Sequence, residues 1–278
     1  MPVSTEFLDR YDAMLARWPV PVESLDVPGR HGTTRVNVCG VPDGPAVVLL
    51  HGGGATSTVW WRNVGALART HRVCAVDLIG DRGRSVYDDG EPLRGTAGLT
   101  GWLDETLDAI GVPAATLVGH SYGGWVATRY ALHAPDRVRR LVLLDPTAVL
   151  SGDRPSFRLR AVPLLFARSQ APYVSFVRWE TGGRELDAQW LELWGSTFGG
   201  RTTLVWPRRV PAADLRTLAM PVLLVLAGRS RQNPTPKLAP AAHSLLRDVR
   251  IVTLPDATHF TLPQQHPEEL GAALADFL

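Results

Sequence analysis

The fold is decided by the stretch Leu117-Val118-Gly119-His120-Ser121-Tyr122-Gly123-Gly124-Trp125. A buried strand ends here, a Gly-His-Ser-Tyr-Gly turn follows, and a helix is predicted over 125–132. The turn matches the G-x-S-x-G pattern, in which a serine occupies a sharp strand-to-helix turn. Gly119 and Gly123 lack the side chains that would hold strand and helix apart. The pattern predicts that Ser121 is a nucleophile above the sheet; a glycine-rich turn that merely contains serine is the alternative for five residues taken alone.

The composition is that of an ordinary globular protein. The 278 residues are 45% hydrophobic and 20% charged, and the net charge is +2. No basic run or basic-and-aromatic stripe indicates a nucleic-acid partner. Residues 1–10 lack the pattern of a signal peptide, and no run of about 18 apolar residues indicates a membrane span. We therefore expect a cytoplasmic protein with no nucleic-acid partner and no membrane span.

The two cysteines point to neither a disulfide nor a metal site. Cys39 and Cys74 both lie in strand-like runs, where a buried, small apolar role is expected. They have no metal-ligand spacing. We expect no metal and no organic cofactor.

Strand and helix patterns alternate along most of the chain. Strands are predicted at 24–27, 34–39, 46–50, 72–76, 116–118, 140–144, 221–227 and 249–254, and helices at 4–18, 59–70, 96–110, 125–132, 237–246 and 268–278. The first two strands are expected to form an antiparallel hairpin, and the later apolar runs suit parallel strands buried on both faces. The alternation predicts an α/β fold with a mostly parallel sheet of about eight strands, covered by helices on both faces.

The alternation stops between residues 147 and 218. This stretch contains Trp179, Trp190, Trp194 and Trp206. We interpret 1–146 and 219–278 as one core, and 147–218 as a helical, aromatic-rich cap over the carboxyl ends of the strands, where such sheets bind ligands. A cap of this kind suggests a small-molecule substrate with an apolar or aromatic portion. A satellite core in which the tryptophans only pack together is the other interpretation.

A base is needed because a serine hydroxyl is a poor nucleophile until its proton is removed. His259 lies in the loop after the last predicted strand, on the same edge of the sheet as Ser121. We predict that His259 is the general base. His51, which opens a glycine-rich turn, is assigned a structural role.

An oxyanion needs preorganised donors, usually two backbone N–H groups. Tyr122, directly after the nucleophile, is predicted to supply one. The other is predicted from the His51-Gly52-Gly53-Gly54 turn, with Gly53 favoured and Gly54 next.

These motifs together resemble the α/β-hydrolase superfamily, and bacterial carboxylesterase-like members in particular. The resemblance rests on four segments in this order: 51–54, Asp77-Leu78-Ile79-Gly80-Asp81-Arg82-Gly83-Arg84-Ser85, 119–124 and Ala257-Thr258-His259-Phe260. It covers the chain from about residue 34 to the C-terminus, and 147–218 matches poorly. It implies the α/β-hydrolase fold but leaves the substrate open, since this fold hosts many reactions.

One departure concerns the triad acid, which in this superfamily usually follows the strand that ends here at 227. The chain has Gly228-Arg229-Ser230-Arg231-Gln232-Asn233 there, without a carboxylate. The family's alternative position, the end of the preceding strand, holds Asp145. Three interpretations stay open: Asp145 is the acid, Asn233 orients His259 instead, or the acid is absent and hydrolysis is impaired.

The resemblance implies a serine hydrolase that cleaves a carboxylic ester, thioester or lactone by a Ser-His-acid acyl-enzyme mechanism. Two alternatives keep the fold and drop hydrolysis. One is a cyclase, lyase or C–C bond enzyme of a biosynthetic pathway, and the other is a non-catalytic, ligand-binding descendant. The sequence carries no prediction of the oligomeric state.

Overall fold

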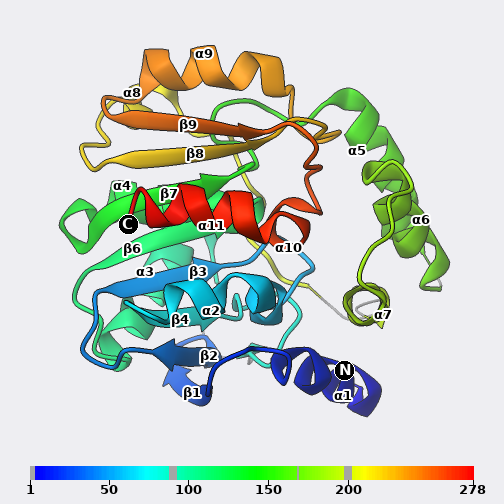
Figure 1. The fold of residues 1–278 in the computed structure, drawn as a ribbon, viewed down its shortest axis with the longest axis horizontal. Helices are drawn as coiled ribbons and strands as arrows, with labels where there is room; N and C mark the ends of the chain where they lie inside the picture. The colour runs from blue at the N-terminus through cyan, green and yellow to red at the C-terminus, as the bar shows by residue number, and fades with distance from the viewer. Residues whose placement is uncertain (1–3, 88–92, 168, 197–201) are drawn as a thin grey trace.

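The structure is a computed structural model that describes residues 4–87, 93–167, 169–196 and 202–278. The other residues fall within the predicted core and cap ranges and lie outside the described part. A central sheet has helices on both sides, and α5, α6 and α7 lie beyond one end of its strands (Figure 1).

The sheet has nine strands, of which eight lie on one path in the order β1-β2-β4-β3-β6-β7-β8-β9. They are β1 Glu23–Gly29, β2 Gly32–Gly40, β3 Ala46–Leu50, β4 Arg72–Val76, β5 Val86–Tyr87, β6 Ala115–His120, β7 Val138–Leu144, β8 Val222–Ala227 and β9 Val249–Leu254. β2 pairs antiparallel with β1, β4 and β5, and all pairs from β4 to β9 are parallel. The predicted hairpin and the mostly parallel sheet are confirmed.

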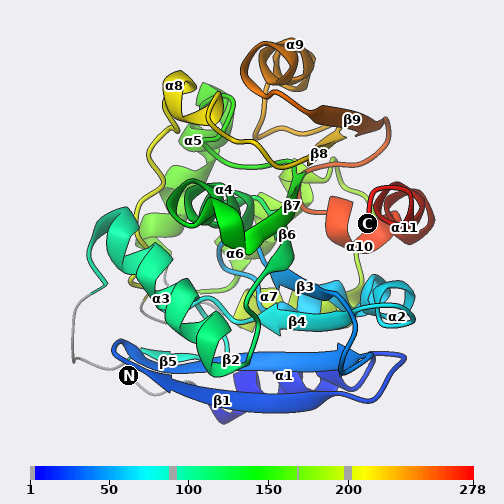
Figure 2. The ribbon, with the colours of Figure 1, turned by 90° about the vertical axis from the view of Figure 1, so that its left-hand side faces the viewer.

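Helices cover both faces of this sheet. The helices of the described residues are α1 Thr5–Leu15, η1 Ser57–Arg62, α2 Val64–Leu67, α3 Gly95–Ala109, α4 Tyr122–His133, η2 Pro135–Arg137, α5 Pro155–Ala161, η3 Val162–Phe166, α6 Ala171–Glu180, α7 Ala188–Ser196, α8 Ala212–Leu215, α9 Thr235–Leu245, α10 Leu262–Gln265 and α11 Pro267–Ala275. Figure 2 shows α3, α4 and α9 on one face and α2 and α11 on the other.

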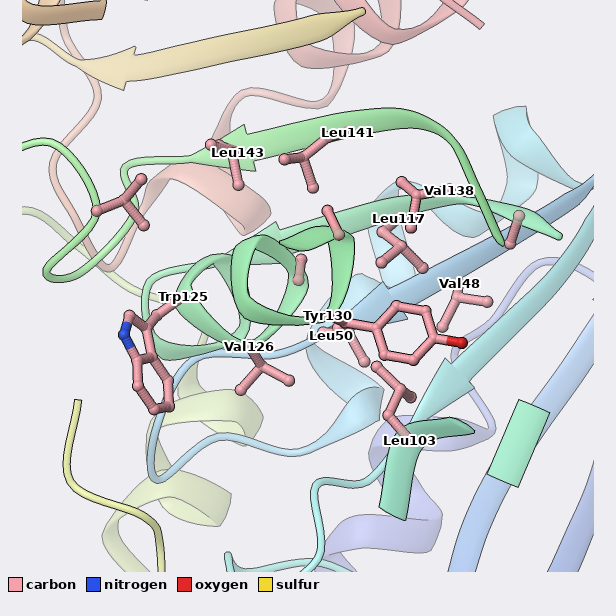
Figure 3. Close-up of a cluster of buried hydrophobic side chains, with 14 of the residues drawn as sticks. Val48, Leu50, Leu103, Leu117, Trp125, Val126, Tyr130, Val138, Leu141 and Leu143 are labelled. Atoms are coloured by element: carbon pink, nitrogen blue, oxygen red, sulfur yellow. The ribbon is translucent and has the colours of Figure 1, made fainter. Parts of the chain in front are cut away.

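The two faces have separate cores because successive side chains of a strand point to opposite sides. In β3, Val48 and Leu50 pack with the α3 and α4 side, whereas Val47 and Leu49 pack with the α2 and α11 side. Figure 3 shows the first of these cores, where Tyr130 of α4 lies among strand side chains. Burial on both faces explains the continuous apolar runs of these strands.

The segment between β7 and β8 contains α5, η3, α6, α7 and α8 and no strand among its described residues.

The prediction of one continuous α-helix over 59–70 is wrong. Residues 57–62 make a 3₁₀ helix, and only 64–67 is α-helical. The N–H of Ser57 donates to Asp77 Oδ1 at 2.7 Å and Trp60 is buried, so tertiary contacts fix this turn against its propensity.

Replacing Gly123 by alanine is expected to destabilise the protein by about 3 kcal/mol, because a Cβ at this position would overlap the main-chain oxygens of Leu50 and His51. The matched control is Gly271→Ala in α11, where a Cβ meets nothing within 4 Å. Alanine there should stabilise the helix by up to about 1 kcal/mol. Urea unfolding of both variants checks the contrast. Equal stabilities would mean that the elbow has room for a side chain.

Candidate active site

Ser121 occupies the turn between β6 and α4, as its glycine neighbours predict. Its backbone has φ 52° and ψ −116°, and its N–H donates to Leu144 O at 3.0 Å. Among the described residues, the non-glycine residues with positive φ are Ser121, Asp145 and Ala148. The strained backbone conformations therefore lie in the segments directly after β6 and β7, and such strain is common at functional sites.

The structure brings His259 to Ser121. His259 Nε2 lies 2.8 Å from Ser121 Oγ, and Nδ1 lies 2.7 Å from Asp145 Oδ2. All three side chains are buried. The three residues follow β6, β7 and β9, and the carboxyl ends of these parallel strands meet at one edge of the sheet.

Asp145 and Asn233 have different places around His259. Asp145 Oδ2 also accepts a hydrogen bond from Ser230 Oγ at 2.7 Å. Asn233 Nδ2 donates to the carbonyl oxygens of Asp145 and Pro146, at 3.2 and 3.4 Å. Asn233 therefore holds the end of β7, and the carboxylate next to the imidazole belongs to Asp145.

The electrostatics around His259 favour its charged form. Burial lowers the pKa of His259, but the hydrogen bond and charge of Asp145, with the charges of Glu180 and Asp153, outweigh burial, and the pKa is raised above its usual value. Burial and the neighbouring His259 lower the pKa of His120 well below its usual value. Neutral His120 donates from Nε2 to the carbonyl oxygen of His259 at 2.9 Å and so steadies the His259 loop.

Gly53 and Tyr122, the predicted oxyanion-hole residues, line the same pocket as Ser121. A Cβ built on Gly53 would lie 3.7 Å from Tyr122 Cβ, so the predicted donors are neighbours. In the described part of the chain, neither the N–H of Gly53 nor that of Tyr122 has an acceptor. Gly54 differs, because its N–H already donates to Asp81 Oδ2 at 2.8 Å. This hydrogen bond favours Gly53 over Gly54 as the second predicted donor.

A pocket of about 370 Å³ lies over Ser121 and His259. Its floor includes Gly52, Gly53 and Tyr122. Much of its wall is apolar and aromatic and comes from the 147–218 segment, through Phe157, Leu164, Tyr173, Phe176, Trp190 and Trp194. The aromatic side chains in this wall thus contact one another as well as the pocket, whereas Trp179 does not line it and Trp206 is exposed.

Comparison with known proteins gives the family. The family model described as "Alpha/beta hydrolase family" matches residues 47–273. The chain belongs to the alpha/beta hydrolase family. Carboxylesterase YbfK of Bacillus subtilis (strain 168) is 34% identical to it over 176 residues, 63% of this chain and 58% of the relative. The uncharacterized carboxylesterase nap of the same organism is 32% identical over 140 residues, 50% of this chain and 46% of the relative. The chain thus spans about half the length of these curated relatives.

Solved structures agree on the fold of this alpha/beta hydrolase. The crystal structure of naproxen esterase (carboxylesterase NP) from Bacillus subtilis superposes with a TM-score of 0.91 at 24% identity, covering 100% of this chain and 99% of the other. Carboxylesterase CesB (YbfK) of the same organism gives 0.90 at 25% identity, covering 98% and 96%. The predicted α/β-hydrolase fold is confirmed.

Sequence reasoning missed a polar network beside the nucleophile. Gln232 Nε2 lies 3.1 Å from Asp153 Oδ1 and 2.6 Å from Thr147 Oγ1, and Thr147 Oγ1 lies 3.1 Å from Ser121 Oγ. A carboxylate only accepts hydrogen bonds, so the Gln232 nitrogen faces Asp153 and donates to Thr147 as well. The Thr147 hydroxyl can then donate to Ser121 Oγ, while Ser121 donates to His259. One feature of the sequence could have indicated this network, because Gln232 lies in the loop where the resemblance implies the triad acid.

His51 has the structural role assigned to it. Its Nε2 accepts the N–H of Leu78 at 3.0 Å, which leaves Nδ1 to donate to Gly52 O at 2.8 Å. The described residues contain no group of three or more His, Cys, Asp or Glu side chains that could hold a metal. In the same residues no helix is both long and apolar enough to cross a membrane.

Proposed function

We propose that this chain is a serine hydrolase that cleaves carboxylic esters through Ser121, His259 and Asp145. The observation that carries this proposal is the continuous hydrogen-bonded arrangement of these three side chains, of which Ser121 and His259 line a largely apolar pocket. The carboxylesterase relatives support it, and thioesters and lactones share the reacting carbonyl group.

The first half of the reaction transfers the acyl group to the protein. Ser121 Oγ forms a bond to the ester carbonyl carbon while its proton passes to His259 Nε2. The N–H groups of Gly53 and Tyr122 bind the oxyanion. The bond to the leaving oxygen then breaks, and His259 delivers its proton to the departing alcohol. Asp145 stabilises the imidazolium throughout.

The second half releases the acid. Water attacks the acyl carbon while His259 takes one of its protons. The bond from this carbon to Ser121 Oγ then breaks, the acid leaves, and His259 returns the proton to Ser121 Oγ. No cofactor takes part in these steps. We further propose that 147–218 is a cap on a core made of 1–146 and 219–278, and that its aromatic wall selects small molecules with an apolar or aromatic acyl or alcohol portion.

The non-hydrolytic and non-catalytic alternatives rested on the missing acid after β8. The contact between Asp145 Oδ2 and His259 Nδ1 supports the hydrolytic proposal over both alternatives. The hydrolytic cycle needs no acid or base group beyond the residues present.

A serine-directed fluorophosphonate and a panel of p-nitrophenyl esters test the proposal. We expect rapid labelling of the folded protein, an adduct that mass spectrometry locates on the peptide containing Ser121, and turnover of the esters. Protein unfolded before labelling is the control and should not react. Absence of both labelling and turnover would overturn the proposal.

A further inference from the structure

Glu180 is a buried carboxylate that the proposed reaction does not use directly. It is the last residue of α6, and its side chain is 0% exposed. A negative charge at the C-terminus of a helix is opposed by the helix dipole, and burial adds a desolvation cost. Helix stability therefore does not account for a glutamate at this position, and its contacts must.

Those contacts are three backbone N–H groups. Glu180 Oε1 accepts from His259 N at 3.0 Å and from Arg231 N at 3.2 Å, and Oε2 accepts from Phe260 N at 3.2 Å. Hydrogen bonds from N–H groups to an ionised acceptor are stronger than neutral ones, so together they offset the cost of burial.

The three N–H groups belong to two loops with different tasks. One loop, 255–261, carries His259. The other, 228–234, carries Ser230, which donates to Asp145 Oδ2, and Asn233, which donates to Asp145 O. A single carboxylate from α6 therefore binds both the loop of the base and the loop that holds the acid.

We propose that Glu180 is a positioning residue through which α6 fixes His259 and Asp145 against each other, so that the base is aligned only while α6 is seated. This role rests on the proposed serine hydrolase mechanism. Glu180 does not line the pocket, so it acts through the loops and not on the substrate. Reaction at Ser121 then depends on the packing of the cap.

The charge of Glu180 also acts on His259. The titratable groups that face His259 are Asp145 after β7, Glu180 on α6, Asp153 before α5 and the neutral His120 at the end of β6. Asp145, Glu180 and Asp153 raise the pKa of His259 and burial opposes them. Removing the charge of Glu180 therefore lowers this pKa. His259 works as a base in its neutral form, so the acid limb of the kcat/KM profile should move to lower pH.

Three variants test the proposal with p-nitrophenyl ester hydrolysis. Glu180→Ala removes all three acceptor contacts and should lower kcat about 10²-fold with KM nearly unchanged. Glu180→Gln keeps the Oε1 contacts without the charge, so it should recover most of the lost kcat while its acid limb lies at lower pH than in the wild type. Glu192→Gln, on the exposed side of α7, makes the same charge change away from His259 and should match the wild type in rate and pH profile.

The titration of His259 gives a readout that does not need turnover. NMR of histidine-labelled protein should show its imidazole titrating at lower pH in Glu180→Gln than in Glu192→Gln. If the wild type hydrolyses esters and both Glu180 variants match Glu192→Gln in kcat, pH profile and titration, the positioning role is wrong. If the wild type hydrolyses nothing, the proposed function fails, while the NMR titration still decides whether Glu180 acts on His259.

Discussion

Replacing Ser121 by alanine is expected to lower kcat for ester hydrolysis by about 10⁵-fold to 10⁶-fold and to abolish fluorophosphonate labelling. The variant loses the only oxygen that His259 Nε2 contacts among the described side chains. Substrate binding should persist, because the pocket wall is unchanged. Stopped-flow and steady-state assays with p-nitrophenyl esters measure the loss. Ser244→Ala on the exposed side of α9 is the control and should retain wild-type turnover.

Two substitutions of Ser121 distinguish the effect of backbone strain on stability from the loss of the nucleophile. Alanine keeps a Cβ at the strained φ of 52°, so Ser121→Ala should unfold at the same urea concentration as the wild type. Glycine adopts this conformation freely, and Ser121→Gly should gain about 1 kcal/mol of stability while it stays inactive. Turnover in either variant above a few per cent of wild type would place the nucleophile elsewhere.

The parts of the site that sequence predicts are those fixed by strand order. Ser121, Asp145 and His259 each follow a parallel strand. The carboxyl ends of parallel strands lie at the same edge of the sheet, independently of the conformation of the loops that follow them. That rule does not choose between Asp145 and Asn233. The choice depends on side-chain direction, and the structure shows Asn233 bonded to the backbone of Asp145.

The parts that sequence misses depend on contacts between distant segments. Glu180 meets the backbone of a residue 79 positions later, and Gln232 meets Thr147 from 85 positions away. No local pattern reports either contact. The same holds for Gly54, whose N–H is taken by Asp81 in the next loop along the chain. The motifs predict the reacting groups, whereas the contacts that hold these groups in place appear only in the folded structure.

Replacing Asp145 by asparagine is expected to lower kcat about 10⁴-fold. Asp145 Oδ2 accepts from both His259 Nδ1 and Ser230 Oγ. The Ser230 bond can keep the amide oxygen of asparagine in that place only if the amide nitrogen points elsewhere. Otherwise the amide donates to Nδ1, leaves the proton on Nε2, and His259 can no longer accept the proton of Ser121. Either arrangement removes the negative charge that stabilises the imidazolium.

Asp256→Asn is the matched control for this charge change, because Asp256 lies in the His259 loop but is exposed and pairs with Arg184 and Arg229. Exposed ion pairs contribute little to stability, so the kcat of this variant should stay within about threefold of the wild type.

Asn233→Ala tests the remaining interpretation, in which Asn233 orients His259. It loosens the end of β7 and should cost less activity than Asp145→Asn, because the carboxylate stays beside His259. A larger loss in Asn233→Ala, with near-normal rates in Asp145→Asn, would make Asn233 the partner of His259 and exclude Asp145 as the acid.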